Sequence, residues 1–143
     1  MTTFEFRVDC DKIRGKARPR FNTYTKRVYT TQEDKAFEAL IRGSYISADG
    51  LYFKENKYLR LEAELYFTIP KSYTKKRKLL CAENVERPAK KPDADNCLKS
   101  IADSLNEIAY KDDIQLVEME CKKYYTTEES PYMIIRLIEI GSK

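Results

Sequence analysis

The sequence predicts an α+β fold, in which helices pack on a small mixed β-sheet within a single domain of residues 1–143. Residues 58–69 alternate apolar and polar side chains, which is the period of a strand with one buried face. Residues 93–109 instead repeat apolar side chains at helical spacing. The length of 143 residues falls in the commonest range for one domain. The expected order is strand, helix, long strand, basic connection, helix, strand, strand.

The first third of the chain predicts a strand, a basic turn region and a helix. Apolar and polar side chains alternate over residues 3–9, as in a strand at the surface of a core. Residues 14–20 are a basic, turn-forming stretch, and an aromatic, β-prone run follows it. Thr30 and Glu33 have the spacing of a capping box ahead of apolar residues at helical spacing. We therefore expect a helix of about 12–16 residues to start near Thr31.

A long basic connection follows the central strand. Pro70 ends the strand because proline donates no hydrogen bond to a sheet. Residues 71–92 then form the connection, with one short helix expected around residues 73–82. A connection this long inside a compact domain is more often functional than a mere spacer. Its clustered lysines and arginines indicate a polyanionic partner, although a solvated loop kept soluble by lysine would have the same composition.

The last third predicts a helix and two strands. Pro92 holds the preceding residue in extended geometry, so the helix of residues 93–109 begins directly after it. Two strands are expected at about residues 114–124 and 132–140. Polar turn residues separate them, so these strands are neighbours along the chain.

The composition excludes several classes of chemistry. The chain has no histidine, so Ser-His-Asp and Cys-His catalysis within one chain are excluded. Its four cysteines lie far apart without a CxxC pair, which predicts no structural zinc. The N-terminus lacks the apolar core of a signal peptide, and no run of about 18 apolar residues occurs. We therefore expect a cytoplasmic protein without a membrane partner.

Four aspartates gather around the helix of residues 93–109. Asp93 and Asp95 lie at its start, where the helix dipole favours carboxylates, and Asp112 and Asp113 precede the next strand. Like charges at one site are unfavourable unless a cation neutralises them. Oxygen ligands without histidine or thiolate favour Mg²⁺ or Mn²⁺ over zinc. Such an ion suits phosphodiester hydrolysis, because it lowers the pKa of a water molecule and stabilises charge on the attacked phosphate.

A stripe of alternating charge runs along the same helix. Asp95, Lys99 and Asp103 are four residues apart and therefore share one face. The ordinary interpretation is an exposed salt-bridge ladder worth about 0.3–0.5 kcal/mol per pair. The alternative is that the stripe belongs to the cation site whose carboxylates flank it. Both interpretations stay open on these residues alone.

These motifs together resemble the RusA-type Holliday junction resolvases of bacteria and their prophages. The resemblance rests on residues 91–96, Lys99, Asp103, residues 105–106 and 112–115, residues 16–20, Tyr29 and residues 69–72. The matches fall in family order and cover the chain from about residue 12 to 140. Two positions depart from the family pattern: Glu107 stands where many relatives have glycine, and Cys97 where an aliphatic residue is usual. Neither touches the proposed ligands, so the expected activity is little affected.

The resemblance implies a homodimer that cuts four-way DNA junctions by paired symmetric nicks with Mg²⁺, in DNA recombination and repair. Each subunit would use three aspartates as metal ligands and catalytic acids, which are by position Asp93, Asp95 and Asp113. Its catalytic lysine would be Lys99, and its supporting acids would be Asp103 and Asp112. The choice of Asp113 over Asp112 depends on aligning the motif Asp-Asp-x-Gln. Lys99 would stabilise charge on the phosphate or the leaving oxygen, and a salt bridge to Asp95 or Asp103 is its alternative role.

The DNA itself would be held by basic residues, namely Lys16, Arg18, Arg20, Lys75, Lys76, Arg77, Lys78, Lys90 and Lys91. The eleven tyrosines are mostly expected in the core or in strands. One or two of them, with Tyr24, Tyr29, Tyr73 and Tyr110 as candidates, would stack on unpaired bases at a junction centre. Two rival interpretations remain: a metal-dependent nuclease that acts on forks or flaps, and a non-catalytic DNA-binding module.

Overall fold

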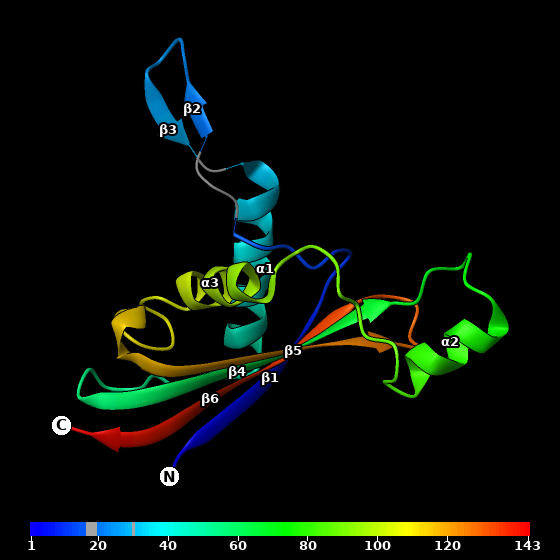
Figure 1. Ribbon diagram of the computed structural model, residues 1–143. Coiled ribbons are helices and arrows are strands. Elements are labelled where there is room, and N and C mark those ends of the chain that lie inside the picture. The colour runs from blue at the N-terminus through cyan, green and yellow to red at the C-terminus, as the bar shows by residue number, and fades with distance from the viewer. Residues whose placement is uncertain (17–19, 30) are drawn as a thin grey trace.

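The computed structural model describes residues 1–16, 20–29 and 31–143, and its centre is a four-stranded β-sheet (Figure 1). The strands are, in spatial order, β1 (Thr3–Asp9), β6 (Tyr132–Ser142), β4 (Lys57–Thr68) and β5 (Leu116–Thr126). β1 and β4 pair antiparallel with β6, whereas β5 runs parallel to β4. The sheet is therefore mixed, and the predicted α+β fold is confirmed.

Three helices accompany the sheet: α1 (Gln32–Ser47), α2 (Lys75–Ala82) and α3 (Ala94–Ser104). α1 and α3 contact each other on one side of the sheet, whereas α2 lies beyond one end of it and contacts β5 (Figure 1). The parallel pair of β4 and β5 needs a long crossover, and α2 and α3 lie within that crossover. None of the described helices is long and apolar enough to cross a membrane.

Helix α1 begins where the sequence predicts. The hydroxyl of Thr31 accepts a hydrogen bond of 3.4 Å from the backbone N–H of Asp34, so Thr31 is the N-cap residue. Thr30, which the capping-box pattern names, lies outside the described residues. The start near residue 31 and the length of 16 residues agree with the prediction.

A separate two-stranded hairpin precedes α1. Its strands are β2 (Arg20–Asn22) and β3 (Arg27–Tyr29), and it stands off the N-terminal end of α1 (Figure 1). It coincides with the β-prone run, but the predicted order of elements did not contain it. Strands of three residues are too short to show the period-2 pattern that identified the longer strands.

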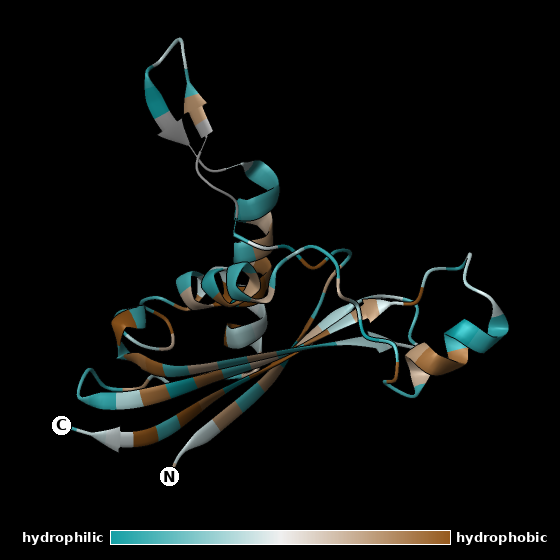
Figure 2. Cartoon of the chain, in the orientation of Figure 1, coloured by the Kyte–Doolittle hydropathy of each residue, from teal (hydrophilic) through white to brown (hydrophobic). Residues whose placement is uncertain are grey.

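The core lies between the sheet and the two packed helices. Alternate residues of β4 are buried, from Leu59 through Leu61 and Leu65 to Phe67, and α1 contributes Ile41 from the other side. Figure 2 shows the corresponding alternation of hydrophobic and hydrophilic bands along the strands. A fully buried side chain of this kind contributes about 1.5–3 kcal/mol of transfer free energy. Burial of this one face therefore fixes the register of the sheet.

Helix α3 is shorter than the predicted helix of residues 93–109, because it ends at Ser104. Glu107 has a φ of 70°, in the left-handed region, which a right-handed helix cannot continue through. The N–H of Glu107 donates instead to the carbonyl oxygen of Tyr110 at 2.6 Å. Leu105 and Ala109 are nevertheless fully buried. The apolar spacing that predicted the longer helix thus belongs to a turn that packs on the same core.

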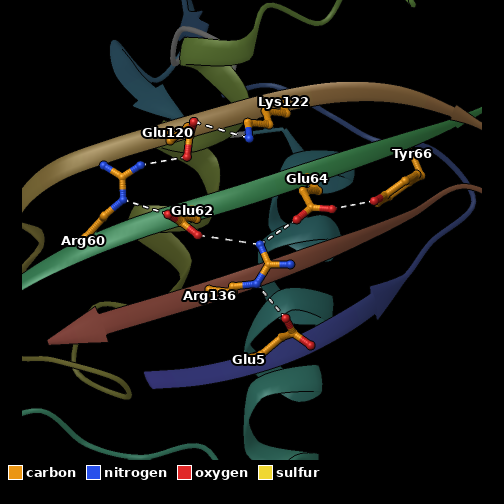
Figure 3. Close-up of polar contacts among 8 residues, drawn as sticks. All are labelled: Glu5, Arg60, Glu62, Glu64, Tyr66, Glu120, Lys122 and Arg136. Carbon is orange, nitrogen blue, oxygen red and sulfur yellow. Dashed lines mark hydrogen bonds and ion pairs between the residues drawn. The ribbon is translucent and has the colours of Figure 1, made fainter. Parts of the chain in front are cut away.

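The face of the sheet away from the helices carries a network of ion pairs (Figure 3). Arg136 on β6 contacts Glu5 at 2.6 Å, Glu62 at 3.7 Å and Glu64 at 2.6 Å. Arg60 on β4 contacts Glu62 at 2.8 Å and also reaches two glutamates of β5. Exposed pairs of this kind are each worth about 0–1 kcal/mol. The network therefore makes this face polar without contributing much to stability.

Candidate functional site

Helix α3 begins at the first pair of acids. Asp93 is its N-cap residue, with an extended backbone (φ −66°, ψ 146°), and Asp95 lies in its first turn. Both residues are exposed, and Asp93 makes no side-chain capping hydrogen bond to the helix. The positive end of the helix dipole favours negative charge at this position. The two carboxylates are therefore presented where an incoming cation can reach them.

A cavity of about 510 Å³ opens beside Asp93. Residues 12–16 form one wall, where the N–H of Lys16 donates to the carbonyl oxygen of Asn96 at 3.0 Å. A Cβ atom added at Gly15 would lie 2.9 Å from the Cβ of Asn96, so this close approach requires glycine. The charged side chains that line the cavity are Lys12, Arg14, Lys16 and Lys91, with Asp34 and Asp93. Predominantly basic walls beside an exposed acid suit a phosphate group.

The second acidic group lies at the other end of α3. Asp103 is in the last turn of the helix, and Asp112 and Asp113 lead into the 3-10 turn η1 (Asp113–Gln115). A hydrogen bond with Asp112, together with burial and the charge of Asp103, raises the pKa of Asp113 to about 6. The same hydrogen bond lowers the pKa of Asp112. Asp113 therefore lies close enough to both Asp103 and Asp112 for these two carboxyl groups to affect its protonation.

Lys16 lies beside this second group. Its Nζ contacts a carboxylate oxygen of Glu38 on α1 and lies 3.4 Å from Oδ2 of Asp103. Burial alone would lower the pKa of Lys16, but the hydrogen bond to Glu38 and the charge of Asp103 raise it overall. The side chain is only 20% exposed. A phosphate contact by Lys16, as the sequence predicts, would thus compete with two carboxylates that it already neutralises.

Lys99 is exposed on α3, one turn after Asp95. Within the part of the chain that the structure describes, no ion pair joins Lys99 to Asp95 or Asp103. Asp103 pairs with Lys16 instead. The salt-bridge ladder that the helical spacing allowed is therefore not formed, and the Lys99 ammonium stays accessible to a ligand.

The predicted metal ligands are divided between the two ends of α3. Asp103 comes about two helical turns after Asp95, which is roughly 12 Å along the axis. Asp113 interacts with Asp103 and so belongs to the second group. Among the described residues, no three or more histidine, cysteine, aspartate or glutamate side chains are grouped closely enough to hold a metal ion. Asp93, Asp95 and Asp113 therefore form two groups here, one exposed and one hydrogen-bonded.

The basic residues of α2 lie away from these acids, beyond one end of the sheet (Figure 1). Lys75 and Lys76 are exposed, and Lys75 and Lys78 line a second cavity of about 430 Å³. The guanidinium of Arg77 lies 3.6 Å from the ring centroid of Tyr73 and pairs with Glu86 at 2.8 Å. The positive charge of Arg77 on α2 is thus partly neutralised by contacts within the protein.

The other basic residues that the sequence predicts to contact DNA lie in different parts of the structure. Lys91 lines the cavity beside Asp93, whereas the Nζ of Lys90 lies 5.6 Å from the ring centroid of Tyr125. Arg18 lies outside the described residues. Arg20 is placed by its backbone, at the start of β2. Lys91 is therefore the predicted DNA contact of the basic connection, residues 71–92, that lies beside Asp93.

Sequence reasoning missed the roles of Asp34, Glu38 and Gln115. Asp34 is 8% exposed, lines the cavity and lies 4.0 Å from Arg14. Gln115 is buried, and its side chain accepts a hydrogen bond from the N–H of Lys111 and donates one to a carbonyl of the chain before β4. The motif Asp-Asp-x-Gln carried the signal for Gln115, because a buried amide that bonds two backbone groups fixes the turn beside it. Asp34 gave no signal, since acids are ordinary near the start of a helix. Glu38 gave none because its partner Lys16 lies in another segment of the chain.

Comparison with known proteins relates this arrangement to a family. The family Endodeoxyribonuclease RusA matches residues 12–138. The Uncharacterized protein YqaN of Bacillus subtilis (strain 168) is 37% identical over 78 residues, which are 53% of this chain. The chain spans 55% of the length of that curated relative. Because the family match covers most of the chain and includes both acidic groups, the chain belongs to the RusA family of endodeoxyribonucleases, as its sequence motifs predict.

Proposed function

We propose that this chain is a Mg²⁺-dependent endodeoxyribonuclease that resolves four-way DNA junctions by paired symmetric nicks, in DNA recombination and repair. The observation that carries the proposal is the RusA family match over residues 12–138, which contains both acidic ends of α3. The basic cavity beside Asp93 supports it, because a nuclease must hold a phosphate next to its acids. In this proposal residues 1–143 act as a single endonuclease domain in the cytoplasm.

The donor atoms of the two acidic groups fit a hard divalent cation, on which nucleases of this family depend. The carboxyl groups offer oxygen alone, and the Oδ1 atom of Asn106, three residues after Asp103, is buried without a hydrogen-bond partner among the described residues. Mg²⁺ prefers such ligands, and Mn²⁺ accepts them too. We propose Asp93, Asp95 and Asp113 as the ligands of this ion, with Asp103 and Asp112 as supporting acids. This assignment requires the two acidic groups, which are separate in the described residues, to approach each other when the ion binds. When bound, it would lower the pKa of a water molecule and stabilise charge on the phosphate.

The side chains around the cavity would position the DNA strand. Lys12, Arg14 and Lys91 line its wall and would contact phosphates, which orients the strand without reading its sequence. Lys99 would stabilise the charge that develops on the attacked phosphate, since Asp95 and Asp103 do not hold it. Placing the phosphate between fixed charges in this way lowers the barrier, because the charges need not reorganise during the reaction.

Paired nicks need two active sites, so we propose that the enzyme works as a homodimer. A two-fold symmetric dimer would place one acidic site on each of two opposite strands of a two-fold symmetric junction. Sedimentation of the free protein tests this directly. The expected mass is twice 16.8 kDa, and a monomer that also stays monomeric on a junction would exclude it.

A nuclease assay on three synthetic DNAs tests the activity. The parent protein is incubated with a four-way junction, a fork and a linear duplex of matched length and sequence, in Mg²⁺ or in EDTA. We expect symmetric nicks on the junction in Mg²⁺ and no cutting in EDTA. Asp93→Asn is the matched negative control, because it removes one proposed ligand from an exposed position without removing a core contact.

The other outcomes identify the rival functions. Metal-dependent cutting of the fork in preference to the junction would make the protein a nuclease of other branched DNA. Binding to all three DNAs without cutting in Mg²⁺ or Mn²⁺ would leave a DNA-binding module. Cutting by the Asp93→Asn variant at the parent rate would show that the acids at the start of α3 are not part of the active site.

A further inference from the structure

The β2–β3 hairpin stands off the body of the protein at the N-terminal end of α1 (Figure 1). Each of its strands is three residues long, and residues 23–26 form the loop between them. At about 3.3 Å per residue, the loop stands roughly 10 Å beyond the base of the hairpin. The tip is therefore a projection, with room around it for a ligand.

The loop at this tip is a defined turn. The Oδ1 atom of Asn22 accepts hydrogen bonds from the N–H groups of Tyr24 at 2.9 Å and Thr25 at 3.1 Å. Lys26 has a φ of 55°, and its N–H donates to the carbonyl oxygen of Asn22 at 2.7 Å. A turn held by three hydrogen bonds loses little conformational freedom when it binds a partner.

The hairpin exposes two aromatic side chains, Tyr24 in the loop and Phe21 in β2. Tyr24 is 97% exposed, more than any other large hydrophobic residue of the described chain, and Phe21 is 58% exposed. Of the other tyrosines that the sequence offered for base stacking, Tyr110 is fully buried and donates to the carbonyl oxygen of Ala102. Tyr73 lies beneath the guanidinium of Arg77. Among the described candidates the structure thus singles out Tyr24.

The charge around the hairpin identifies the chemistry of its partner. The chain has seven basic and no acidic residues between Asp11 and Glu33. Lys26 and Arg27, at the tip and at the start of β3, are both exposed. Such a segment attracts phosphates, and aromatic rings among basic residues stack on bases that are not paired. A nucleic acid with accessible bases therefore fits the tip better than a closed duplex does.

The base of the hairpin is close along the chain to residues that line the cavity beside Asp93. The chain reaches β2 shortly after Lys16 and enters α1 shortly after β3, and both Lys16 and Asp34 line the cavity beside Asp93. A DNA strand in that cavity would therefore pass the foot of the hairpin. The tip could then reach a neighbouring part of the same DNA molecule.

We propose that the β2–β3 hairpin inserts Tyr24, supported by Phe21, among the unpaired or opened bases at a DNA branch point. Lys26 and Arg27 hold the phosphates on either side. This role rests on the proposed action on branched DNA and adds to it the element that recognises the branch. It separates junction recognition, which the hairpin performs, from strand cutting, which the acids of α3 perform.

The experiment measures junction binding and base opening without cleavage. A four-way junction carries 2-aminopurine at the branch point, and its fluorescence is followed in EDTA as protein is added. We expect the parent to increase the fluorescence, and Tyr24→Ala to abolish the increase and weaken junction binding about 5-fold to 100-fold. Tyr24→Phe should behave like the parent, because phenylalanine keeps the ring. Binding of a linear duplex should change less than twofold in Tyr24→Ala.

Two further variants control for general effects. Tyr52 lies beyond the other end of α1 and is 54% exposed, so Tyr52→Ala should leave both fluorescence and affinity unchanged. The double variant Lys26→Ala/Arg27→Ala should weaken junction and duplex alike, and reduce the slope of log affinity against log salt by about 2. Tyr24 is almost fully exposed, so thermal unfolding of Tyr24→Ala should match the parent.

The inference is overturned if Tyr24→Ala opens and binds the junction as the parent does, or if it weakens junction and duplex equally. Its failure is distinguishable from failure of the proposed nuclease. A parent that nicks junctions in Mg²⁺ while Tyr24→Ala keeps full base opening would refute the hairpin role alone. A parent that never nicks DNA, yet opens the branch only when Tyr24 is present, would refute the nuclease and leave branch recognition standing.

Discussion

The two ends of helix α3 carry the same kind of residue in opposite surroundings. At the N-terminal end, Asp93 and Asp95 are exposed and lie at the positive end of the helix dipole. At the C-terminal end, Asp103 lies where the dipole disfavours negative charge, next to Asp112 and Asp113. The first pair therefore tolerates its charge without help, whereas the second group needs a counter-charge.

The structure shows how the second group obtains that counter-charge. Lys16 places its ammonium 3.4 Å from Asp103, and a hydrogen bond with Asp112 raises the pKa of Asp113 to about 6. The contrast teaches that an acidic motif spread along a sequence can fold into two electrostatically different halves. One half can receive a cation directly, and the other is already partly neutralised by the protein.

The largest expected effects come from substituting one aspartate at each end of α3 and measuring both DNA cleavage and protein stability. Asp93→Asn and Asp113→Asn should each lower junction cleavage at least about 100-fold, because each removes a proposed metal ligand. Their unfolding free energies should differ: Asp113→Asn relieves repulsion and should be neutral or stabilising, whereas Asp93→Asn loses a favourable dipole interaction of about 0.3–1 kcal/mol. Single-turnover cleavage and urea unfolding measure the two quantities.

Asp112→Asn is the matched control for this comparison. It removes the neighbouring acid of the same pair, and its cleavage should fall less than that of Asp113→Asn. The opposite order would move the third essential acid to Asp112. Equal stability changes at both ends of α3 would remove the electrostatic difference between them.

The next effect concerns the lysine between the two halves. Lys99→Ala should lower the cleavage rate about 10-fold to 100-fold, because it removes the ammonium group that would stabilise the negative charge developing on the attacked phosphate. Junction binding in EDTA should change less than twofold, since one exposed charge among many contributes little to affinity. A variant that cuts at the parent rate would refute the catalytic role. A variant that loses binding and cleavage in proportion would make Lys99 a phosphate contact instead.

The ion pairs of Lys16 with the acids near the C-terminal end of α3 should contribute to the stability of the fold. Lys16→Met should lower the free energy of unfolding by about 1–2 kcal/mol, because it leaves Glu38 and Asp103 partly buried without their cation. Lys12→Met is the matched control: Lys12 lines the same cavity but is exposed, so its loss should cost little. Adding Glu38→Gln to Lys16→Met should restore part of the loss. Urea unfolding in which both single variants equal the parent would show that Lys16 is not the counter-ion of this group.

Most of the fold follows from local patterns in the sequence. The alternation of residues 58–69 and the helical spacing after Pro92 were correct because burial of one face imposes them. The aspartates on either side of α3 were recognised because carboxylates that precede and follow a helix are conspicuous in a sequence. Their division into an exposed pair and a hydrogen-bonded group was not predicted. The pairing of Lys16 with Glu38 and Asp103 could not be found, since it joins three segments that come together only through the packing of α1 on α3.

The end of α3 was mispredicted for a different reason. Apolar side chains at Leu105 and Ala109 continue the helical spacing, so the sequence pattern alone cannot show that the helix stops at Ser104. What stops it is the backbone of Glu107, with its φ of 70°. The resemblance to the RusA pattern marked this position, because it implies a glycine there, and glycine adopts this φ without a steric penalty.

The smallest expected effect tests this account of the turn. Glu107→Gly should raise the free energy of unfolding by about 0.5–1 kcal/mol, because it relieves the left-handed backbone at the end of α3. Glu107→Ala is the matched control, since it removes the same carboxylate but keeps a Cβ and therefore the strain. Urea unfolding of the two variants separates the causes. If Glu107→Ala stabilises the protein as much as Glu107→Gly does, the loss of negative charge near Asp103 causes the stabilisation. The repulsion among the acids then includes the turn after α3. If glycine alone stabilises, backbone geometry ends α3 and the electrostatic contrast stays confined to the aspartates.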